Sequence, residues 1–190
     1  MKRRVVVGVS GASGAIYASR ILGCLRDAGA DVDLVFTKTG RVVWNHELGT
    51  DPRDFGFPIH GSSDFTAPIA SGSVRIDGMV VVPCSSGAAA RIAHGLSLDL
   101  VGRAADVVLK ERKPLVLVLR ESPLSLVHLR NLTQLAEAGA VVLPASPGFY
   151  HLPKSIDELV DHVVARALDR LGIDNELSRR WTGLGESHDD

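Results

Sequence analysis

The stretch that most constrains this chain is GVSGASG at residues 8–14, because it separates an apolar run from a segment typical of a helix. Val5–Val7 precede it and residues 15–27 follow it, which predicts a buried strand that turns directly into a helix. Backbone N–H groups and the positive end of a helix dipole attract anions at such a turn. The sequence therefore predicts a phosphate-binding loop, although a tight turn that needs small residues only for packing explains the same pattern.

The spacing of the glycines narrows the kind of nucleotide that this loop would hold. Gly8, Gly11 and Gly14 follow a Gly-x-x-Gly-x-x-Gly pattern, whereas dinucleotide sites use Gly-x-Gly-x-x-Gly. The Lys-Ser or Lys-Thr ending of nucleoside triphosphate loops is also missing. A mononucleotide such as FMN therefore fits this loop better than NAD or ATP.

Apolar runs alternate with helical segments along the chain, a pattern typical of a parallel sheet covered by helices on both faces. We expect one Rossmann-like (flavodoxin-like) α/β domain over residues 1–185, followed by a frayed tail at 186–190. The segment 49–78 is predicted to be a long ordered excursion that belongs to an active site or a subunit contact. The expected strands are 4–8, 31–37, 79–82, 114–119 and 140–143, and the expected helices are 15–27, 38–48, 88–94, 100–113, 124–138 and a last one that a capping box at 155–158 opens and that ends at 171.

Composition excludes several classes of function. A net charge of −1 gives no reason to expect a nucleic-acid or membrane-surface partner, and no segment approaches the roughly 20 apolar residues of a membrane span. The two cysteines imply no disulfide framework and are compatible with a cytoplasmic location. The seven histidines lack the spacing of a zinc site, so we expect no metal.

Polar or small residues follow every expected strand, and the carboxyl ends of parallel strands bind ligands. Arg120 and Glu121 could hold an anionic leaving group and move its proton, or form a plain surface ion pair. Cys84 is either a thiol nucleophile or a buried residue that only packs. We expect one ligand-binding edge from the residues after these strands, which are Ser13, Thr37, Lys38, Cys84–Gly87, Arg120, Glu121 and 144–150.

A second group of charges lies on the helix expected at 100–113. Arg103 and Lys110 are two helical turns apart and share a face, with Asp106 between them. They are either a solvated ladder of ion pairs or two cations that face a phosphate.

Several separate motifs together resemble the UbiX/Pad1 family of flavin prenyltransferases, within the homo-oligomeric FMN-binding flavoproteins. The likeness extends from about residue 2 to Trp181. The matching stretches are GVSGASGA at 8–15, ASGS at 70–73, MVVVPCS at 79–85, RAADVVLKER at 103–112, 114–123 and PGFYH at 147–151.

The resemblance implies a reaction and a set of partners. N5 of reduced FMN would attack C1 of dimethylallyl monophosphate, phosphate would leave, and a second bond from C6 would close a ring. The prenylated FMN would serve a UbiD-type decarboxylase, and the chain would assemble into a homo-oligomer, expected to be a dodecamer, whose neighbouring subunits complete the site.

The resemblance also implies roles for individual residues. Glu47 and Glu121 would manage protons, and Trp181 would lie near the allylic cation. The prenyl phosphate would be bound by Ser71, Lys110, Arg120, Tyr150 and Arg166, of which Lys110 and Arg120 also count as catalytic. FMN would be held by Gly11, Ala12, Ser13, Thr37, Ser85, Ser86, Gly87, Ala88 and Arg103.

Two observations refine this expectation. The chain has no Asp-Asp-x-x-Asp cluster to hold a diphosphate through magnesium, so Lys and Arg would have to neutralise a monophosphate directly. Gly87 and Ala88 stand where many family members have a Lys-Thr or Gly-Thr pair, which removes one hydroxyl near the flavin. The alternatives are an FMN-dependent cysteine decarboxylase of the same flavoprotein group and a non-catalytic flavin carrier.

Overall fold

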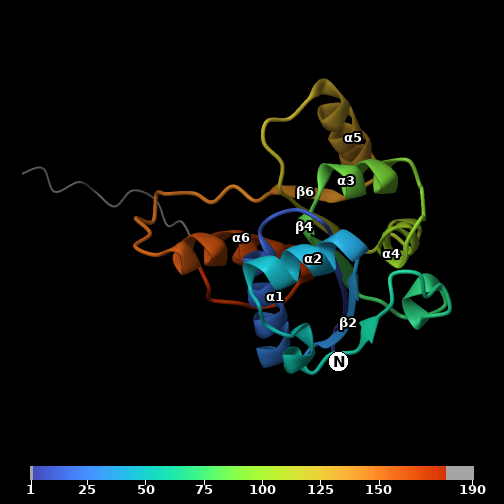
Figure 1. Ribbon diagram of the computed structural model, residues 1–190, viewed down its shortest axis with the longest axis horizontal. Helices are drawn as coiled ribbons and strands as arrows, with labels where there is room; N and C mark the ends of the chain where they lie inside the picture. Colours follow the sequence, from blue (N-terminus) through green and yellow to red (C-terminus); the bar gives the residue numbers. More distant parts are fainter. Residues whose placement is uncertain (1, 179–190) are drawn as a thin grey trace, which may run out of the picture.

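The protein, described here by a computed structural model over residues 2–178, is built on one six-stranded parallel sheet (Figure 1). The strands are apolar and inaccessible along most of their length because helices cover both faces of the sheet. They are β1 (Arg4–Val9), β2 (Asp31–Phe36), β3 (Ile59–His60), β4 (Gly78–Cys84), β5 (Leu115–Leu119) and β6 (Val141–Pro144).

The strand order is β3-β2-β1-β4-β5-β6, and every neighbouring pair is parallel. The five longer strands alone have the flavodoxin-like order, and the two-residue strand β3 extends one edge. The direction of winding reverses between β1 and β4. Doubly wound sheets bind ligands in the crevice at that point, so the fold places the loops after β1 and β4 where a ligand is expected.

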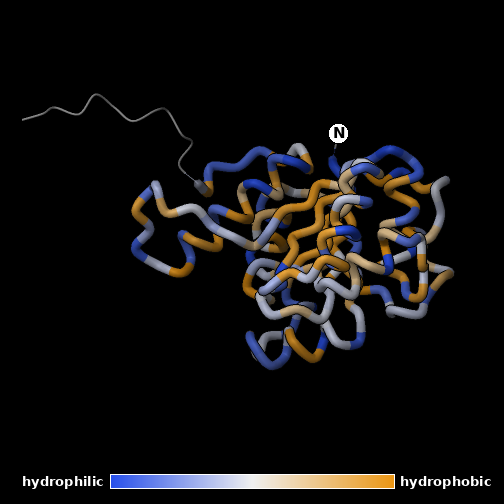
Figure 2. The backbone as a smooth tube through the Cα atoms, turned by 90° about the horizontal axis from the view of Figure 1, so that it is seen from above, coloured by the Kyte–Doolittle hydropathy of each residue, from blue (hydrophilic) through white to orange (hydrophobic). Residues whose placement is uncertain are grey.

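Two helical layers enclose the sheet and separate its hydrophobic core into two clusters. On one face, α1 and α6 pack with Trp44 of α2 over residues such as Leu34. On the other face, α3, α4 and α5 pack over residues such as Leu117. Figure 2 shows the apolar strands in the middle of the molecule, with more polar segments around them. The helices are α1 (Ala15–Asp27), α2 (Lys38–Glu47), α3 (Ser86–Ala93), α4 (Leu100–Lys110), α5 (Leu126–Glu137) and α6 (Ile156–Leu171).

Most expected elements agree with the structure, and their bounds differ by a few residues. The expected excursion at 49–78 is ordered: it contains two short 3-10 helices, η1 (Pro52–Phe55) and η2 (Pro68–Ala70), and Ile69 of η2 is fully buried. It also contains β3, which the sequence analysis missed. Two residues are too few to show an alternating pattern, so β3 is defined only by its pairing with β2.

One expected helix cap differs in detail. The Glu158 N–H donates to Ser155 Oγ at 3.2 Å, as a capping box requires, but the Glu158 carboxylate accepts from the Lys154 N–H at 2.8 Å rather than from that of Ser155. A complete capping box instead opens α5, where the ring of His128 replaces the usual glutamate and Ser125 is the N-cap. Within the described part of the chain, every helix is too short or too polar to span a lipid bilayer.

Candidate functional site

The loops after β1 and β4 are joined by Ser10, which is 1% exposed. Its hydroxyl donates to the carbonyl oxygen of Pro83 at 2.8 Å and accepts the backbone N–H of Ser85 at 2.8 Å. Ser10 is not among the site residues predicted from the sequence, although a hydroxyl directly after an apolar strand is a usable signal. Ser10 holds the two sides of the crevice in a fixed relation.

Three helices begin at this edge of the sheet, namely α1, α2 and α3. Thr37 caps α2 by accepting the Gly40 N–H at 2.9 Å, and Ser85 caps α3 by accepting the Ala88 N–H at 3.2 Å. Helix N-termini that meet at one place produce a positive potential there. These hydroxyls, which were predicted to hold FMN, therefore also orient the backbone around the crevice.

Two glycines let the segments at this edge come close together. A Cβ on Gly40 would collide with the carbonyl of Val9, and a Cβ on Gly11 would collide with the side chain of Thr39. At Gly87 a Cβ would be in ordinary van der Waals contact with Arg91, at 3.7 Å, and would collide with nothing. The small residues at 11 and 40 are thus needed for packing, whereas packing within the chain does not require a glycine at 87.

Glu47 changes the interpretation of the loop at 8–14. Its carboxylate accepts the N–H groups of Gly14 at 2.9 Å and Ala15 at 2.7 Å, so the N-terminus of α1 already holds a protein anion. This corrects the expectation that the helix end is open. Burial disfavours the charge of Glu47, but the Ser13 hydroxyl, these N–H groups and Arg120 outweigh it and lower the pKa.

Glu121 lies on the other side of the crevice, after β5. The Ser86 hydroxyl donates to its carboxylate at 2.6 Å and the Ser122 N–H donates at 3.2 Å. The Ser86 hydrogen bond is the main cause of the lowered pKa of Glu121, and Arg120 contributes to it. Because the Arg120 charge lowers the pKa of both Glu47 and Glu121, these three groups share one electrostatic environment.

Cys84 was expected to be either a thiol nucleophile or a buried residue that only packs, and the structure favours the buried residue. It is 0% exposed, and burial raises its pKa to about 12. A thiol in this state has almost no nucleophilic thiolate near neutral pH.

A second set of predicted residues lies beside α4. Arg103 donates to the carbonyl of Ala70 at 3.0 Å and pairs with Asp106 at 2.9 Å. Lys110 pairs with Glu111, and both side chains lie against Gly72. Ser71, in the same loop as Gly72, forms a hydroxyl contact with Ser73 at 2.9 Å. We call Ser71, Arg103 and Lys110 the α4 group.

A third set lies beside α6, and we call Tyr150 and Arg166 the α6 group. The segment 145–155 extends away from the sheet after β6 and turns back into α6 (Figure 1). Tyr150 therefore leaves the edge of the sheet and packs on His162, with ring centroids 5.7 Å apart. Arg166 follows His162 by one helical turn and is exposed.

One chain does not bring Lys110, Arg120 and Arg166 together. Arg120 follows the carboxyl end of β5, whereas Lys110 ends α4 and is followed by the turn that enters β5 at its opposite end. The helices α4 and α6 cover opposite faces of the sheet, so the sheet separates the α4 group from the α6 group. Trp181 lies outside the described residues.

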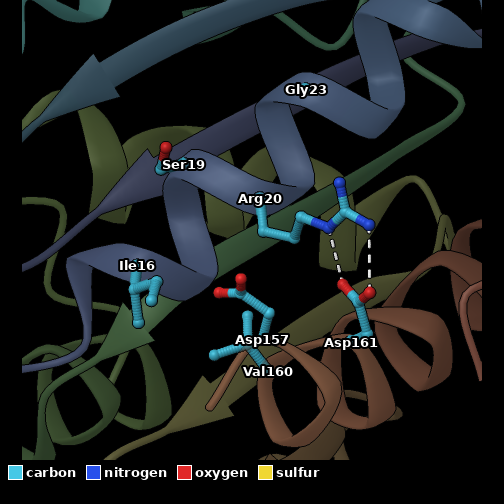
Figure 3. A pocket seen from close by; sticks show the side chains of 7 residues that line it. All are labelled: Ile16, Ser19, Arg20, Gly23, Asp157, Val160 and Asp161. Carbon is cyan, nitrogen blue, oxygen red and sulfur yellow. Dashed lines mark hydrogen bonds and ion pairs between the residues drawn. The ribbon is translucent and has the colours of Figure 1, made fainter. Parts of the chain in front are cut away.

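The hollow in Figure 3 lies between α1 and α6 and is distinct from the crevice. It has a volume of about 400 Å³. Arg20 and Asp161, which both line it, form an ion pair with two hydrogen bonds. None of the predicted site residues lines it. Within residues 2–178, no cluster of three or more His, Cys, Asp or Glu side chains could hold a metal ion.

Comparisons with known proteins show which proteins this chain is similar to. The family model Flavoprotein matches residues 1–168. The flavin prenyltransferase UbiX of Thermoplasma acidophilum is 48% identical over 94% of this chain and 99% of its own length. The flavin prenyltransferase UbiX of Synechocystis sp. is 47% identical over 96% of this chain and 98% of its own length.

Solved structures show the same relation. A crystal structure of AnUbiX (PadA1) in complex with FMN and dimethylallyl pyrophosphate has a TM-score of 0.94, 42% identity and coverage of 97% of this chain and 100% of that one. A dodecameric FMN-dependent Ubix-like decarboxylase from Escherichia coli O157:H7 has a TM-score of 0.91 and 42% identity, and it covers 95% of this chain and 100% of its own.

Proposed function

The chain belongs to the UbiX flavin prenyltransferases of the Flavoprotein family, and from that premise we propose that it transfers a dimethylallyl group to reduced FMN. The observation that carries the proposal is the 48% identity with a UbiX relative over 94% of this chain, combined with the charge of Arg120, which lowers the pKa of both Glu47 and Glu121. Bound reduced FMN would supply the nucleophilic ring nitrogen and the ring carbon that accept the dimethylallyl group.

The residues around the crevice suit a flavin mononucleotide. Hydroxyls of Thr37 and Ser85 cap two helix N-termini, and such N-termini favour a phosphate. We assign FMN binding to Gly11, Ala12, Ser13, Thr37, Ser85, Ser86, Gly87, Ala88 and, from another copy of the chain, Arg103.

Cations neutralise the leaving phosphate in the proposed reaction. The departing group of an allylic transfer gains negative charge, which fixed Lys and Arg side chains stabilise without a metal ion. We assign this role to Lys110, Arg120 and Arg166, with hydroxyl donors from Tyr150 and Ser71. Trp181 is proposed to face the allylic cation, because an aromatic face stabilises positive charge.

Glu47 and Glu121 are the proposed proton carriers. Both carboxylates are ionised near neutral pH and are held by donors from neighbouring loops, so each can accept a proton at a fixed position. Glu121 accepts a hydrogen bond from Ser86, which follows the neighbouring strand β4, and this contact gives that proton a route through a hydroxyl.

Assembly is part of the proposal, because the α4 group and the α6 group lie on opposite faces of one chain. A site that needs both must combine different copies. The dodecameric relative provides a precedent for such an assembly. We propose a homo-oligomer, as a dodecamer, whose neighbouring copies supply the α4 and α6 groups to one crevice.

The donor and the recipient of the product are proposed from chemistry. A monophosphate suits direct neutralisation by Lys and Arg, whereas the AnUbiX crystal structure contains the pyrophosphate of the same alcohol. We propose dimethylallyl monophosphate as donor and delivery of the prenylated flavin to a UbiD-type decarboxylase. Both cysteines are free thiols, which suits the proposed cytoplasmic location.

The deciding experiment is an anaerobic incubation of the FMN-loaded protein with a reductant and dimethylallyl monophosphate. We expect the extracted flavin to gain the mass of one isoprene unit and the visible spectrum to change. A parallel reaction with the diphosphate tests the choice of donor. An unchanged flavin with both donors would contradict the proposal.

The two alternatives are tested in the same preparation. An FMN-dependent cysteine decarboxylase would release carbon dioxide from a cysteinyl peptide or pantothenoyl-cysteine, and a flavin carrier would bind FMN without converting any of these compounds. We expect neither result, because a carrier gives no reason for Arg120 to lower the pKa of both Glu47 and Glu121.

A further inference from the structure

His162 is held by hydrogen bonds at both of its ring nitrogens. The backbone N–H of Gly148 is 3.2 Å from Nδ1, and the hydroxyl of Tyr150 is 3.3 Å from Nε2. His162 belongs to α6, whereas Gly148 and Tyr150 belong to the extended segment 145–155. The ring therefore joins that segment to α6, and it does so at Tyr150, which the proposed function assigns to phosphate binding.

The partners of His162 determine where its proton lies. A backbone N–H can only donate, so Nδ1 must accept and therefore carries no hydrogen. In the neutral ring the hydrogen is then on Nε2, which donates to the oxygen of Tyr150. The phenol keeps its own hydrogen, which it can donate to an anion.

The surroundings of His162 favour this neutral form. Burial of the ring lowers its pKa, and the neighbouring His151 and Arg166 lower it further. The His151 ring stacks on it at a centroid distance of 5.3 Å and an interplanar angle of 7°. These contacts fix the plane of the His162 ring, and with it the direction of Nε2.

Resting on the proposed function, we propose that His162 is a positioning residue for the prenyl phosphate. Anchored by Gly148, it donates Nε2–H to the Tyr150 oxygen and so directs the phenolic hydrogen toward the phosphate that the proposed function also assigns to Arg166. The role belongs to ground-state and transition-state binding of the phosphate, not to proton transfer, because His162 keeps its hydrogen throughout.

A double-mutant cycle tests this role. We expect Tyr150→Phe to lower kcat/KM for dimethylallyl monophosphate by roughly 3- to 10-fold, the value of one hydrogen bond to the phosphate. His162→Phe keeps the ring but neither hydrogen bond, and we expect a loss of about the same size, mainly through KM. In the Tyr150→Phe background, His162→Phe should cause less than about a twofold further loss. Independent losses that multiply would overturn the proposal.

A matched pair of amide variants covers the case in which His162→Phe fails to fold. Gln can reach the Tyr150 oxygen as Nε2 does, whereas Asn is one methylene shorter and can serve only Gly148. We expect His162→Gln to bind the donor within about threefold of the parent and His162→Asn to match Tyr150→Phe. Equal affinity of the Gln and Asn variants would also overturn the proposal.

A binding measurement separates this inference from the proposed function. The affinity of dimethylallyl monophosphate for the assembled protein with oxidised FMN is measured by calorimetry, which needs no turnover. We expect the same order of affinities as in the kinetic cycle, with an unchanged affinity for FMN. If the parent binds the donor but never prenylates the flavin, the proposed function fails while the role of His162 is still decided by the order of affinities.

Discussion

The crevice between the loops after β1 and β4 and the two peripheral groups on α4 and α6 are organised differently. Contacts within one chain define the crevice: Ser10 joins its walls, and Glu47 and Glu121 are held by defined donors. In the α4 group, Arg103 pairs with Asp106 and Lys110 pairs with Glu111. The α6 group lies on the opposite face of the sheet. On the proposed assignment, most FMN contacts come from one folded chain and one, Arg103, comes from another copy, whereas prenyl transfer needs both peripheral groups and therefore the assembly.

The largest effect that tests this division is expected from Lys110→Ala. Loss of a cation that faces the leaving phosphate should lower kcat by about 10²- to 10³-fold. FMN binding should be retained, because Lys110 is assigned to the prenyl phosphate and not to FMN. Steady-state rates and FMN titration measure the two quantities. Lys113→Ala, a neighbouring exposed lysine beyond the end of α4, is the matched control and should stay within about twofold.

Mixed assemblies sharpen the same prediction. Assemblies made only of Lys110→Ala subunits, or only of Arg166→Ala subunits, are expected to be nearly inactive. A random mixture of equal amounts of the two contains some sites in which both side chains are native. We expect recovery of about a quarter of the native activity, since each site draws the two residues from two different copies. Mixed oligomers that stay inactive would show that the groups do not cooperate across copies.

A smaller effect is expected from Glu47→Gln, which tests the crevice. Gln keeps the size of the side chain and one acceptor for the Ala15 N–H but loses the charge and the basicity. We expect kcat to fall by about 10²-fold through lost proton transfer, while the thermal midpoint changes little. Rapid-mixing kinetics of the flavin spectrum measure the step. Native turnover in this variant would remove Glu47 from the proton route.

The packing of the crevice is tested by Gly40→Ala. Its Cβ would collide with the Val9 carbonyl, so we expect the free energy of unfolding to fall by about 1–3 kcal/mol and FMN affinity to weaken. Gly23→Ala is the control within α1, where a Cβ meets no atom within 4 Å. That change should stabilise the helix by about 0.5–1 kcal/mol. Urea unfolding distinguishes the two, and equal stabilities would show that the close approach at Gly40 is unnecessary.

The smallest effect concerns acid. The pKa of Glu47 is lowered in the folded protein, so its ionised form stabilises the fold above the unfolded pKa, and this contribution is lost as the pH falls through the folded pKa. The difference in unfolding free energy between the parent and Glu47→Gln should therefore shrink between about pH 6 and pH 3, by less than about 1 kcal/mol. The contributions of the other carboxylates are the same in both proteins and cancel in this difference. A difference that grows on acidification would contradict the lowered pKa.

Local sequence patterns predicted much of this architecture. Apolar runs and helix caps are encoded by neighbouring residues, so β1, α1 and α4 could be predicted to within a few residues. Residues that directly follow buried strands, such as Ser86 and Glu121, could be assigned to one edge of the sheet because parallel strands share their direction. The hydrogen bond between these two residues is consistent with that assignment.

The contacts that decide chemistry needed the tertiary structure. Nothing adjacent to Glu47 in the sequence indicates that its carboxylate caps α1, more than thirty residues away. The orientation of His162 depends in the same way on Gly148 and Tyr150, which a turn of the chain brings back to α6. Sequence patterns predicted the secondary structure and the binding edge because these depend on local periodicity. Packing decided which charges meet, because contacts between distant segments form only when the layers close around the sheet.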